Sequence, residues 1–263
     1  MNRTTTISSV VWIEMIRRKD VYVLLILLLA LLFILMSLNV FGLGAVVGYV
    51  ADIGLVFAWL FSVILCVSLT ARQLPQEEAK GTIYPLLAKP ITRAELVLGK
   101  WLGAWSASAA CTLLFYAVIL VVLRLRGGSL NVACLAQAVL LHLVALAIVG
   151  GCALLCSTRM TYGAAASVGY VVLAACFAVV PRVPELLMYE RGASSTAMLG
   201  LYYALPHLEL FDLRQRLVHD WGPAPWGVVG GVVLYGLLWA VIFITLSWMA
   251  YRNKRFKRGA MSA

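Results

Sequence analysis

Six segments of the chain are apolar over about 20 residues, the length that a helix needs to cross a membrane. A helix rises about 1.5 Å per residue, so each segment spans a hydrocarbon core of roughly 30 Å. Of all residues, 63% are hydrophobic and 12% are charged, and the mean hydropathy is +0.96, far from the balance of soluble domains. We therefore predict an all-α integral membrane protein, a single transmembrane domain over 1–263, with spans at 21–41, 53–70, 103–123, 132–156, 162–180 and 226–250.

The basic residues are distributed unevenly between the segments that flank these spans. Fifteen of the 21 Lys and Arg residues, but only five of the 11 acidic residues, lie in 1–20, 72–100, the link around Arg159 and 251–263. Cytoplasmic segments carry such an excess, so both termini are expected in the cytoplasm and the chain in a bacterial cytoplasmic (inner) membrane. A net charge of +10 would suggest nucleic acid in a soluble chain. Here topology and anionic membrane lipid explain it, and no nucleic-acid partner is expected.

The two ends of the chain are predicted to lie at the cytoplasmic membrane surface. In 1–20, helical spacing gathers four apolar residues on one face, which indicates an interfacial helix: Val11, Trp12, Met15 and Ile16. A cleaved signal peptide is the alternative, but the apolar run that follows is longer than a signal core and lacks a nearby small-residue cleavage pattern. Basic and aromatic residues in the tail 251–263 are expected to anchor the last span.

The longest polar interruption in the first two thirds of the chain is 72–100, which carries strong helix-boundary signals. Pro75 followed by two glutamates suits the first turn of a helix, where negative charge meets the positive end of the helix dipole. Gly81 then marks a break in the helical pattern. Thr92 and Glu95 have the spacing of a capping box that opens a second helix. We predict two short helices joined by a turn, and we interpret the segment as a docking site for a soluble partner.

The order of motifs in this segment resembles the cytoplasmic loop of ABC type-2 transporter permeases. That family uses wording close to E-x-x-x-G-T, L-L, P-[IV]-[ST]-R and L-G-K. The matching residues here are Glu77-Glu78, Gly81-Thr82, Leu86-Leu87, Lys89-Pro90-Ile91-Thr92-Arg93 and Leu98-Gly99-Lys100. Pro85 departs from the pattern, since the family continues a helix at that point. The overall layout, including the amphipathic amino-terminal segment and the basic carboxy-terminus, is also similar.

The resemblance implies a function for the chain. In that family the loop forms a coupling helix, between spans two and three, that docks on an ATPase subunit. Two permease chains, identical or related, stand on two ATPase chains that bind ATP and Mg²⁺, so no cofactor is expected in this chain. The implied activity is export, and uniformly apolar spans favour lipid-like or hydrophobic cargo. The residues implied in docking and coupling are Glu77, Glu78, Gly81, Thr82, Pro90, Arg93 and Lys100.

The sequence lacks motifs for other activities. It contains no G-x-x-x-x-G-K-[ST] phosphate-binding loop, and no span has the central charged residue that a proton-driven carrier needs. No paired nucleophile and base supports an intramembrane enzyme, so we expect no catalytic residue and ATP hydrolysis only in a partner chain. The alternative is a membrane scaffold that recruits a soluble protein through 72–100 without moving a substrate.

The longest outer connection, 181–225, is predicted to carry two short amphipathic helices, one starting near Pro184 and one over 205–214. The second, with the wording L-P-x-L-E-L-F-D-L-R, resembles a motif of some permeases in this family, where outer helices precede the final span. We interpret it as a lid over the exit path, formed by Pro206, Leu208, Glu209 and Phe211. Five polar residues of this connection are interpreted as a solvated charged face, with a metal site as the alternative: His207, Glu209, Asp212, His219 and Asp220.

Small and polar residues within the spans have structural interpretations. Pairs of small residues indicate close helix contacts, either inside the subunit or at a dimer seam: Gly103 with Ala107, Gly163 with Ser167, Ala165 with Gly169, and Gly227 with Gly231. The six cysteines suit small apolar positions, although Cys152 and Cys156, one turn apart, leave a metal as the alternative. His142 is predicted to hydrogen-bond a neighbouring helix. No metal site is expected.

Overall fold

The computed structural model describes residues 3–37, 46–79, 81, 92–125, 127–128, 130–189, 193–252 and 254. All regular structure among these residues is helical. The elements in chain order are α1 (Arg3–Arg18), α2 (Asp20–Ser37), α3 (Val46–Ala79), α5 (Arg93–Leu125), α6 (Val132–Ser157), α7 (Tyr162–Ala178), η1 (Val180–Arg182), α8 (Val183–Tyr189), α9 (Ala193–Ala204), η2 (Leu208–Phe211), α10 (Arg214–Val218) and α11 (Trp226–Arg252).

Five stretches of helix are long and apolar enough to cross a membrane: Gly48–Ala79, Arg93–Leu125, Val132–Ser157, Tyr162–Leu186 and Trp226–Arg252. The chain is therefore an integral membrane protein, as predicted. The remaining predicted span, 21–41, is represented by a shorter apolar helix, Val21–Ile34. Its last residues, 38–41, lie outside the described part of the chain.

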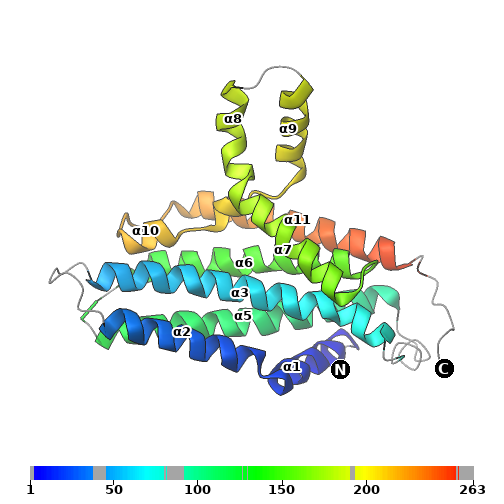
Figure 1. Cartoon of the computed structure of the whole chain (residues 1–263), viewed down its shortest axis with the longest axis horizontal. Helices are drawn as coiled ribbons and strands as arrows, with labels where there is room; N and C mark the ends of the chain where they lie inside the picture. Colours follow the sequence, from blue (N-terminus) through cyan, green and yellow to red (C-terminus); the bar gives the residue numbers. More distant parts are fainter. Residues whose placement is uncertain are drawn as a thin grey trace.

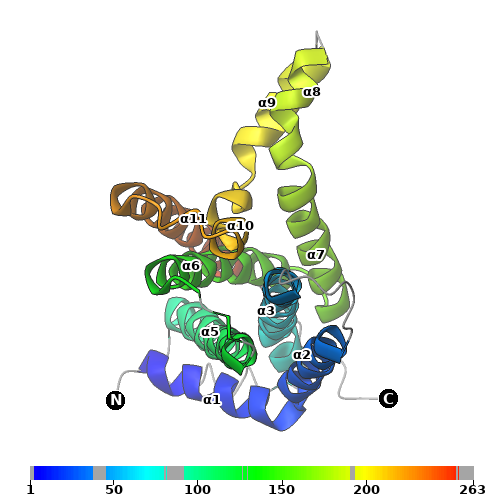
Figure 2. The same ribbon diagram turned by 90° about the vertical axis from the view of Figure 1, so that its left-hand side faces the viewer.

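The long helices run roughly side by side as a bundle (Figure 1). Helices α3, α5 and α6 form its centre, α11 packs along α6, and α2 packs against α3. Seen along the bundle, α1 crosses beneath α5 (Figure 2). Helix α7 leans away from the other helices, and α8 and α9 project from the side of the bundle as a hairpin.

Helices α3 and α5 are longer than the predicted spans. They contain 34 and 33 residues, about 50 Å at 1.5 Å per residue, which exceeds the hydrocarbon thickness of roughly 30 Å. The polar end of α3 and the polar start of α5 lie at the same end of the bundle, where the chain passes through 80–91. We call this end the loop end.

The prediction that Pro75 starts a separate helix is wrong, because Pro75 lies inside α3. A proline removes one backbone hydrogen bond, but the surrounding turns are reinforced. Arg72 Nε donates to the carbonyl oxygen of Ser68 at 2.7 Å, and Gln73 Nε2 donates to that of Leu69 at 3.1 Å. Leu74 is buried in an apolar cluster with residues of α5 and α11. Tertiary packing therefore allows α3 to continue through Pro75.

Helix α1 packs directly on α5 through two glycines. A Cβ atom at Gly99 would lie 2.8 Å from Ile7 Cβ, and one at Gly103 would lie 2.8 Å from Val11 Cγ2. Ser8 Oγ donates to the carbonyl oxygen of Gly99 at 3.0 Å. The side of α1 that meets α5 repeats every four residues through Ile7, Val11 and Met15, whereas Ile16, predicted on the same apolar face, is 52% exposed.

The other small-residue pairs divide into two groups. Ala107 and Ala165 are fully buried, and Gly169 faces Val67 Cγ1 at 3.3 Å, so these positions serve contacts inside the subunit. Around Gly163, Gly227 and Gly231 no atom of the described chain lies within 4 Å of a Cβ position. These three glycines lie on open surfaces of α7 and α11.

Candidate functional site

At the loop end, the start of α5 is fixed by a capping box. The backbone N–H of Thr92 donates to Glu95 Oε2 at 2.7 Å, and the N–H of Glu95 donates to Thr92 Oγ1 at 3.2 Å. These bonds satisfy backbone donors that the first helical turn leaves without partners. The capping box predicted from the spacing of these residues is confirmed.

Two carboxylates at the end of α3 pair with lysines from other helices. Glu77 forms an ion pair with Lys100 of α5, whose side chain is only 3% exposed. Glu78 pairs with Lys254, just after α11, at 2.7 Å and 2.8 Å. Lys254 Nζ also donates to the carbonyl oxygen of Thr158, the cap of α6, at 2.8 Å. Glu77 and Glu78 therefore link α3 to three other helices.

Arg93, in the first turn of α5, binds the end of α11. Its Nη1 donates to the carbonyl oxygens of Tyr251 at 2.9 Å, Arg252 at 2.7 Å and Lys254 at 3.1 Å. The last carbonyls of a helix have no partner within the helix and carry partial negative charge, so a guanidinium stabilises them. We call the contacts of Glu77, Glu78, Arg93, Lys100 and Lys254 the loop-end network.

The structure brings together four of the seven residues that the resemblance implies in coupling: Glu77, Glu78, Arg93 and Lys100. Gly81 adopts a positive φ of 68°, which a residue without Cβ adopts readily, and follows the end of α3. Thr82 and Pro90 lie outside the described residues.

A cavity of about 630 Å³ lies between α3 and α7, toward the end of the bundle opposite the loop. Its walls are mainly apolar, with aromatic side chains from both helices, including Trp59, Tyr170 and Phe177. Three charged residues from η2 and α10 and the turn between them, Glu209, Asp212 and Arg214, complete it. Apolar walls with a few polar groups are typical of small-molecule sites, whose volumes run from about 300 to 1,000 Å³. We call this space the α3–α7 cavity.

The charged groups of the α3–α7 cavity differ in their partners. Arg214 donates to both carboxylate oxygens of Asp212, at 2.8 Å and 2.5 Å, and its guanidinium lies 5.8 Å from the Trp59 ring centre. Partial burial lowers the pKa of Arg214, but the hydrogen bond and charge of Asp212 raise it to a net value above the ordinary one, so the guanidinium stays charged. Glu209 Oε2 is buried and has no hydrogen-bond partner among the described residues.

The predicted outer lid is firmly packed into the bundle. Its helix over 205–214 is replaced by η2 and α10, because Leu208 and Phe211 both turn inward and are fully buried. A Cβ atom at Gly236 of α11 would lie 2.7 Å from the Phe211 ring. Pro206 is buried, whereas Glu209 borders the α3–α7 cavity. Helix α9 was not anticipated.

The described part of the chain contains no group of three His, Cys, Asp or Glu residues that could hold a metal ion. All six cysteines are free. His142 is buried beside Tyr116 of α5, with Nδ1 3.3 Å from the phenol oxygen, and stacks on Trp59 of α3 at 4.8 Å. The predicted hydrogen bond between His142 and a neighbouring helix is confirmed.

Sequence reasoning missed three residues of these sites. Lys254 belongs to a basic tail that was assigned to lipid headgroups, and nothing in its spacing indicates that it pairs with Glu78. Trp59 and Tyr170 lie in apolar spans, where an aromatic side chain gives no signal that separates a cavity wall from a packed core. Neither a protein-family model nor a curated protein matches the chain.

Proposed function

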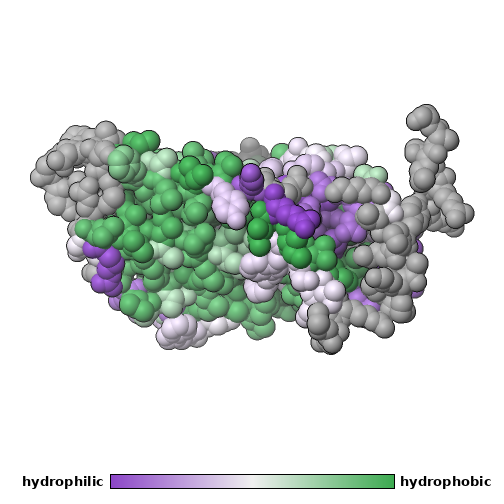
Figure 3. All heavy atoms as spheres, turned by 90° about the horizontal axis from the view of Figure 1, so that it is seen from below, coloured by the Kyte–Doolittle hydropathy of each residue, from purple (hydrophilic) through white to green (hydrophobic). Residues whose placement is uncertain are grey.

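We propose that this chain is the permease subunit of an ABC exporter in a bacterial cytoplasmic membrane, with both termini cytoplasmic. In this proposal 21–41 is a sixth span in addition to the five. Its described part lies in α2 and exposes large hydrophobic side chains: Tyr22, Val23, Ile26, Leu27, Leu29, Phe33 and Ile34. The face of the molecule that carries α1 and α2 is mainly hydrophobic on the left and in the centre, and its hydrophilic residues lie at the left edge and, in a larger group, to the right of the centre on the side of α1 (Figure 3). This distribution supports α1 as the interfacial helix.

The observation that carries the proposal is the loop-end network. The segment 80–91 connects α3 to α5, and both of its attachment points are tied by charged contacts to each other and to α6 and α11. A displacement of the loop therefore acts on four helices together. A flexible recruitment site would not need its two ends to be fixed in this way.

In the proposed mechanism, a partner ATPase binds ATP and Mg²⁺ and pushes on the loop as it closes. Because α3 and α5 extend beyond the hydrocarbon core, they act as levers on the membrane part of the chain. Only 22% of the apolar window of α11 is buried, against 72% for α6. Such open surfaces leave room for a second permease chain, identical or related, and for lipid.

The α3–α7 cavity supports an amphipathic or hydrophobic cargo. Its aromatic walls suit an apolar body, and the buried Glu209 Oε2 offers an acceptor to a donor group on the cargo. The scaffold function remains the second candidate, but no feature of the described residues favours it, and a scaffold has no need of this cavity.

The first experiment separates docking from transmission. The charge reversals Lys80→Glu and Lys89→Glu alter the loop itself, whereas Arg93→Ala alters the loop-end network. We expect the loop variants to lose an ATPase subunit on co-purification from native membrane. Arg93→Ala should keep the ATPase but lower the dependence of its hydrolysis rate on cargo. Arg124→Ala, an exposed residue at the opposite end of α5, is the matched control.

A second experiment addresses the path. Leu60→Trp adds a large side chain at a wall of the α3–α7 cavity, whereas Leu113→Trp, at a similarly exposed position on α5, does not line it. Leu60→Trp should abolish transport into inverted vesicles while the ATPase remains bound, and Leu113→Trp should not. If no ATP-binding protein co-purifies in mild detergent, transport by this mechanism is rejected and the scaffold is favoured.

A further inference from the structure

The α3–α7 cavity opens on a surface of the bundle that carries apolar side chains. Val56 and Leu60 of α3 line the cavity one turn apart and are 40% and 48% exposed. Ala174 of α7, which also lines it, is exposed. Apolar side chains that stand open on a membrane-spanning helix face lipid rather than water. An occupant therefore enters from the membrane and has an apolar part.

The aromatic walls of the cavity are held in place by contacts within the protein. Trp59 of α3 is buried and meets the Phe177 ring of α7 edge to face, with the ring centres 4.6 Å apart. The Tyr170 hydroxyl donates to the carbonyl oxygen of Ile64 at 3.1 Å and lies 2.8 Å from Ser68 Oγ. Because these bonds engage the Tyr170 hydroxyl, an occupant meets aromatic rings here rather than a free hydroxyl.

The charged end of the cavity has more negative than positive charge among the described residues that line it. Glu209 and Asp212 supply two carboxylates, and Arg214 supplies one guanidinium. Both carboxylate oxygens of Asp212 accept hydrogen bonds from Arg214, so these two residues neutralise each other. Glu209 differs from them, because its Oε2 is buried and has no hydrogen-bond partner among the described residues. One carboxylate therefore remains for an occupant.

This arrangement favours a positively charged donor over other headgroups. A buried carboxylate oxygen without a donor is unfavourable, because folding removes its water without supplying another partner. A donor on the occupant restores the hydrogen bond, and a charged donor makes it stronger than a neutral one does. Aromatic rings within reach also attract a cation. An anionic headgroup would instead add to the excess of negative charge.

We infer that the α3–α7 cavity selects an amphiphile that carries a protonated amine, with the ammonium group at Glu209 Oε2 and the apolar chain along α3. The lining residues of α3 run from Val56 to Ile64, about 12 Å at 1.5 Å per residue, which gives the chain a continuous wall. The role of this amine as cargo rests on the proposed export function. Its binding to the cavity requires no partner subunit.

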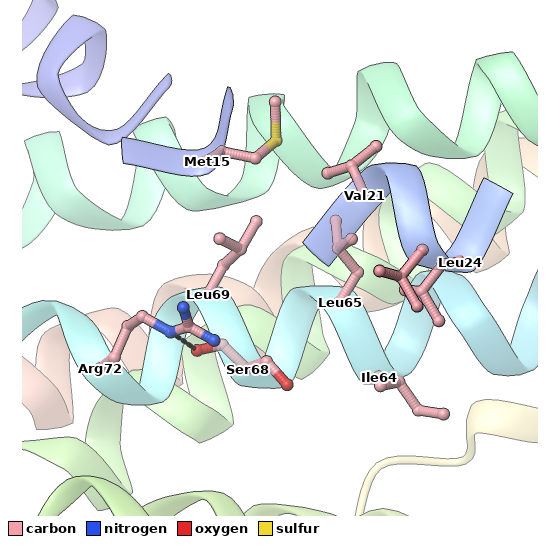
Figure 4. Close-up of a pocket in the computed structure, with 9 residues that line it drawn as sticks. Met15, Val21, Leu24, Ile64, Leu65, Ser68, Leu69 and Arg72 are labelled. Atoms are coloured by element: carbon pink, nitrogen blue, oxygen red, sulfur yellow. Dashed lines mark hydrogen bonds between the residues drawn. The ribbon is translucent and has the colours of Figure 1, made fainter. Parts of the chain in front are cut away.

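A smaller pocket on the same side of α3 provides a comparison. Its volume is about 320 Å³, and residues of α1, α2 and α3 line it, among them Met15, Val21 and Leu65 (Figure 4). Val23, which also lines it, is 63% exposed, so an apolar chain has access. No carboxylate lies among the described residues that line this pocket. An unselective amphiphile has access to both spaces, whereas an amine that needs Glu209 is confined to the α3–α7 cavity.

Equilibrium binding of radiolabelled dodecylamine to the purified full chain in phosphatidylcholine nanodiscs tests the proposal. Dodecanol, which has the same chain without the charge, should compete about tenfold more weakly than unlabelled dodecylamine. Glu209→Gln keeps the size of the side chain but removes its charge, and should lower the affinity about tenfold. Glu185→Gln, at an exposed position of α8 outside the cavity, should leave the affinity unchanged. Equal competition by dodecanol, or unchanged affinity in Glu209→Gln, overturns the proposal.

A second pair of variants leaves Glu209 in place and so remains informative if Glu209→Gln fails to fold. Leu60→Trp adds a large side chain at the α3–α7 cavity, and Val23→Trp adds the same side chain at the smaller pocket. Leu60→Trp should remove dodecylamine binding, and Val23→Trp should retain it. Retention in Leu60→Trp with loss in Val23→Trp would assign the amine to the smaller pocket and overturn the proposal.

Dioleoyl phosphatidylethanolamine carries the same ammonium group on a membrane lipid. If it competes with dodecylamine, the source of the amine is a lipid headgroup; if it does not, the source is a free amine, and the proposal stands in both cases. The binding test also separates this inference from the proposed function. Dodecylamine binding without a co-purifying ATPase rejects export and keeps the site. A co-purifying ATPase without dodecylamine binding keeps export and rejects the amine as its cargo.

Discussion

Arg93, in the first turn of α5, donates a hydrogen bond of 2.7 Å to the carbonyl oxygen of Arg252, in the last turn of α11. The two residues are 159 positions apart in the sequence. The contact joins the start of the helix that follows the loop to the end of the last helix of the chain. It links the loop to a helix that the loop does not itself connect.

Loss of the Arg93 side chain should loosen the end of α11. Arg93→Ala removes the three hydrogen bonds that Nη1 makes to the carbonyl oxygens of Tyr251, Arg252 and Lys254 at the end of α11, so the last turn should fray. Because the arginine is part-exposed, the expected loss of stability is about 1 kcal/mol. Hydrogen exchange should rise in 248–252 and stay unchanged in α6. Arg93→Lys should recover part of the protection, and equal protection in all three chains would contradict the assignment.

The pairing of Glu77 with Lys100 should be stronger than a surface ion pair. Glu77→Gln leaves the buried Lys100 ammonium without its carboxylate, so the free energy of unfolding should fall by about 2–4 kcal/mol. A double-mutant cycle with Lys100→Met measures the coupling through thermal unfolding in detergent. We expect the double variant to lose less stability than the sum of the single variants. Strict additivity would mean that the two residues do not interact.

The contact between α1 and α5 depends on the glycine at 103. In Gly103→Ala the new methyl group would meet Val11 Cγ2 at 2.8 Å and the Ser8 backbone at 3.0 Å, so α1 must move. Overpacking of this kind costs about 1–3 kcal/mol. The hydrogen bond from Trp12 Nε1 to Ser106 Oγ, 2.9 Å long, should break, which a shift in tryptophan fluorescence reports. Gly163→Ala, with open space at its Cβ position, is the control and should leave stability and fluorescence unchanged.

The position of η2 depends on Gly236 of α11. Gly236→Ala would place a methyl group 2.7 Å from the Phe211 ring and closer still to Val144 Cγ1, so both side chains must shift. We expect the free energy of unfolding to fall by about 1–3 kcal/mol. A cysteine introduced at position 209 should react faster with a thiol reagent. Gly231→Ala, also on α11, meets no atom within 4 Å. Unchanged labelling in Gly236→Ala would show that η2 does not depend on this contact.

Local patterns were sufficient for several elements. The capping box of Thr92 and Glu95 was predictable because all its atoms lie within one turn of chain. The helix expected over 205–214 divides into η2 and α10, and only the packing of the bundle shows that Leu208 and Phe211 are buried. In α1, spacing defines an apolar face but not which edge of that face meets the neighbouring helix.

The sequence alone determined that the chain lies in a membrane, because the length and apolarity of a spanning helix are local properties that no partner changes. It also identified the residues of the loop region that now form the loop-end network. Only the tertiary structure decided their partners. Helix α3 continues through Pro75 because Leu74 is packed from two sides. Glu78 pairs with Lys254 because α3 and α11 end side by side. Such contacts join residues far apart in the chain, and their energies depend on distances that sequence spacing does not contain.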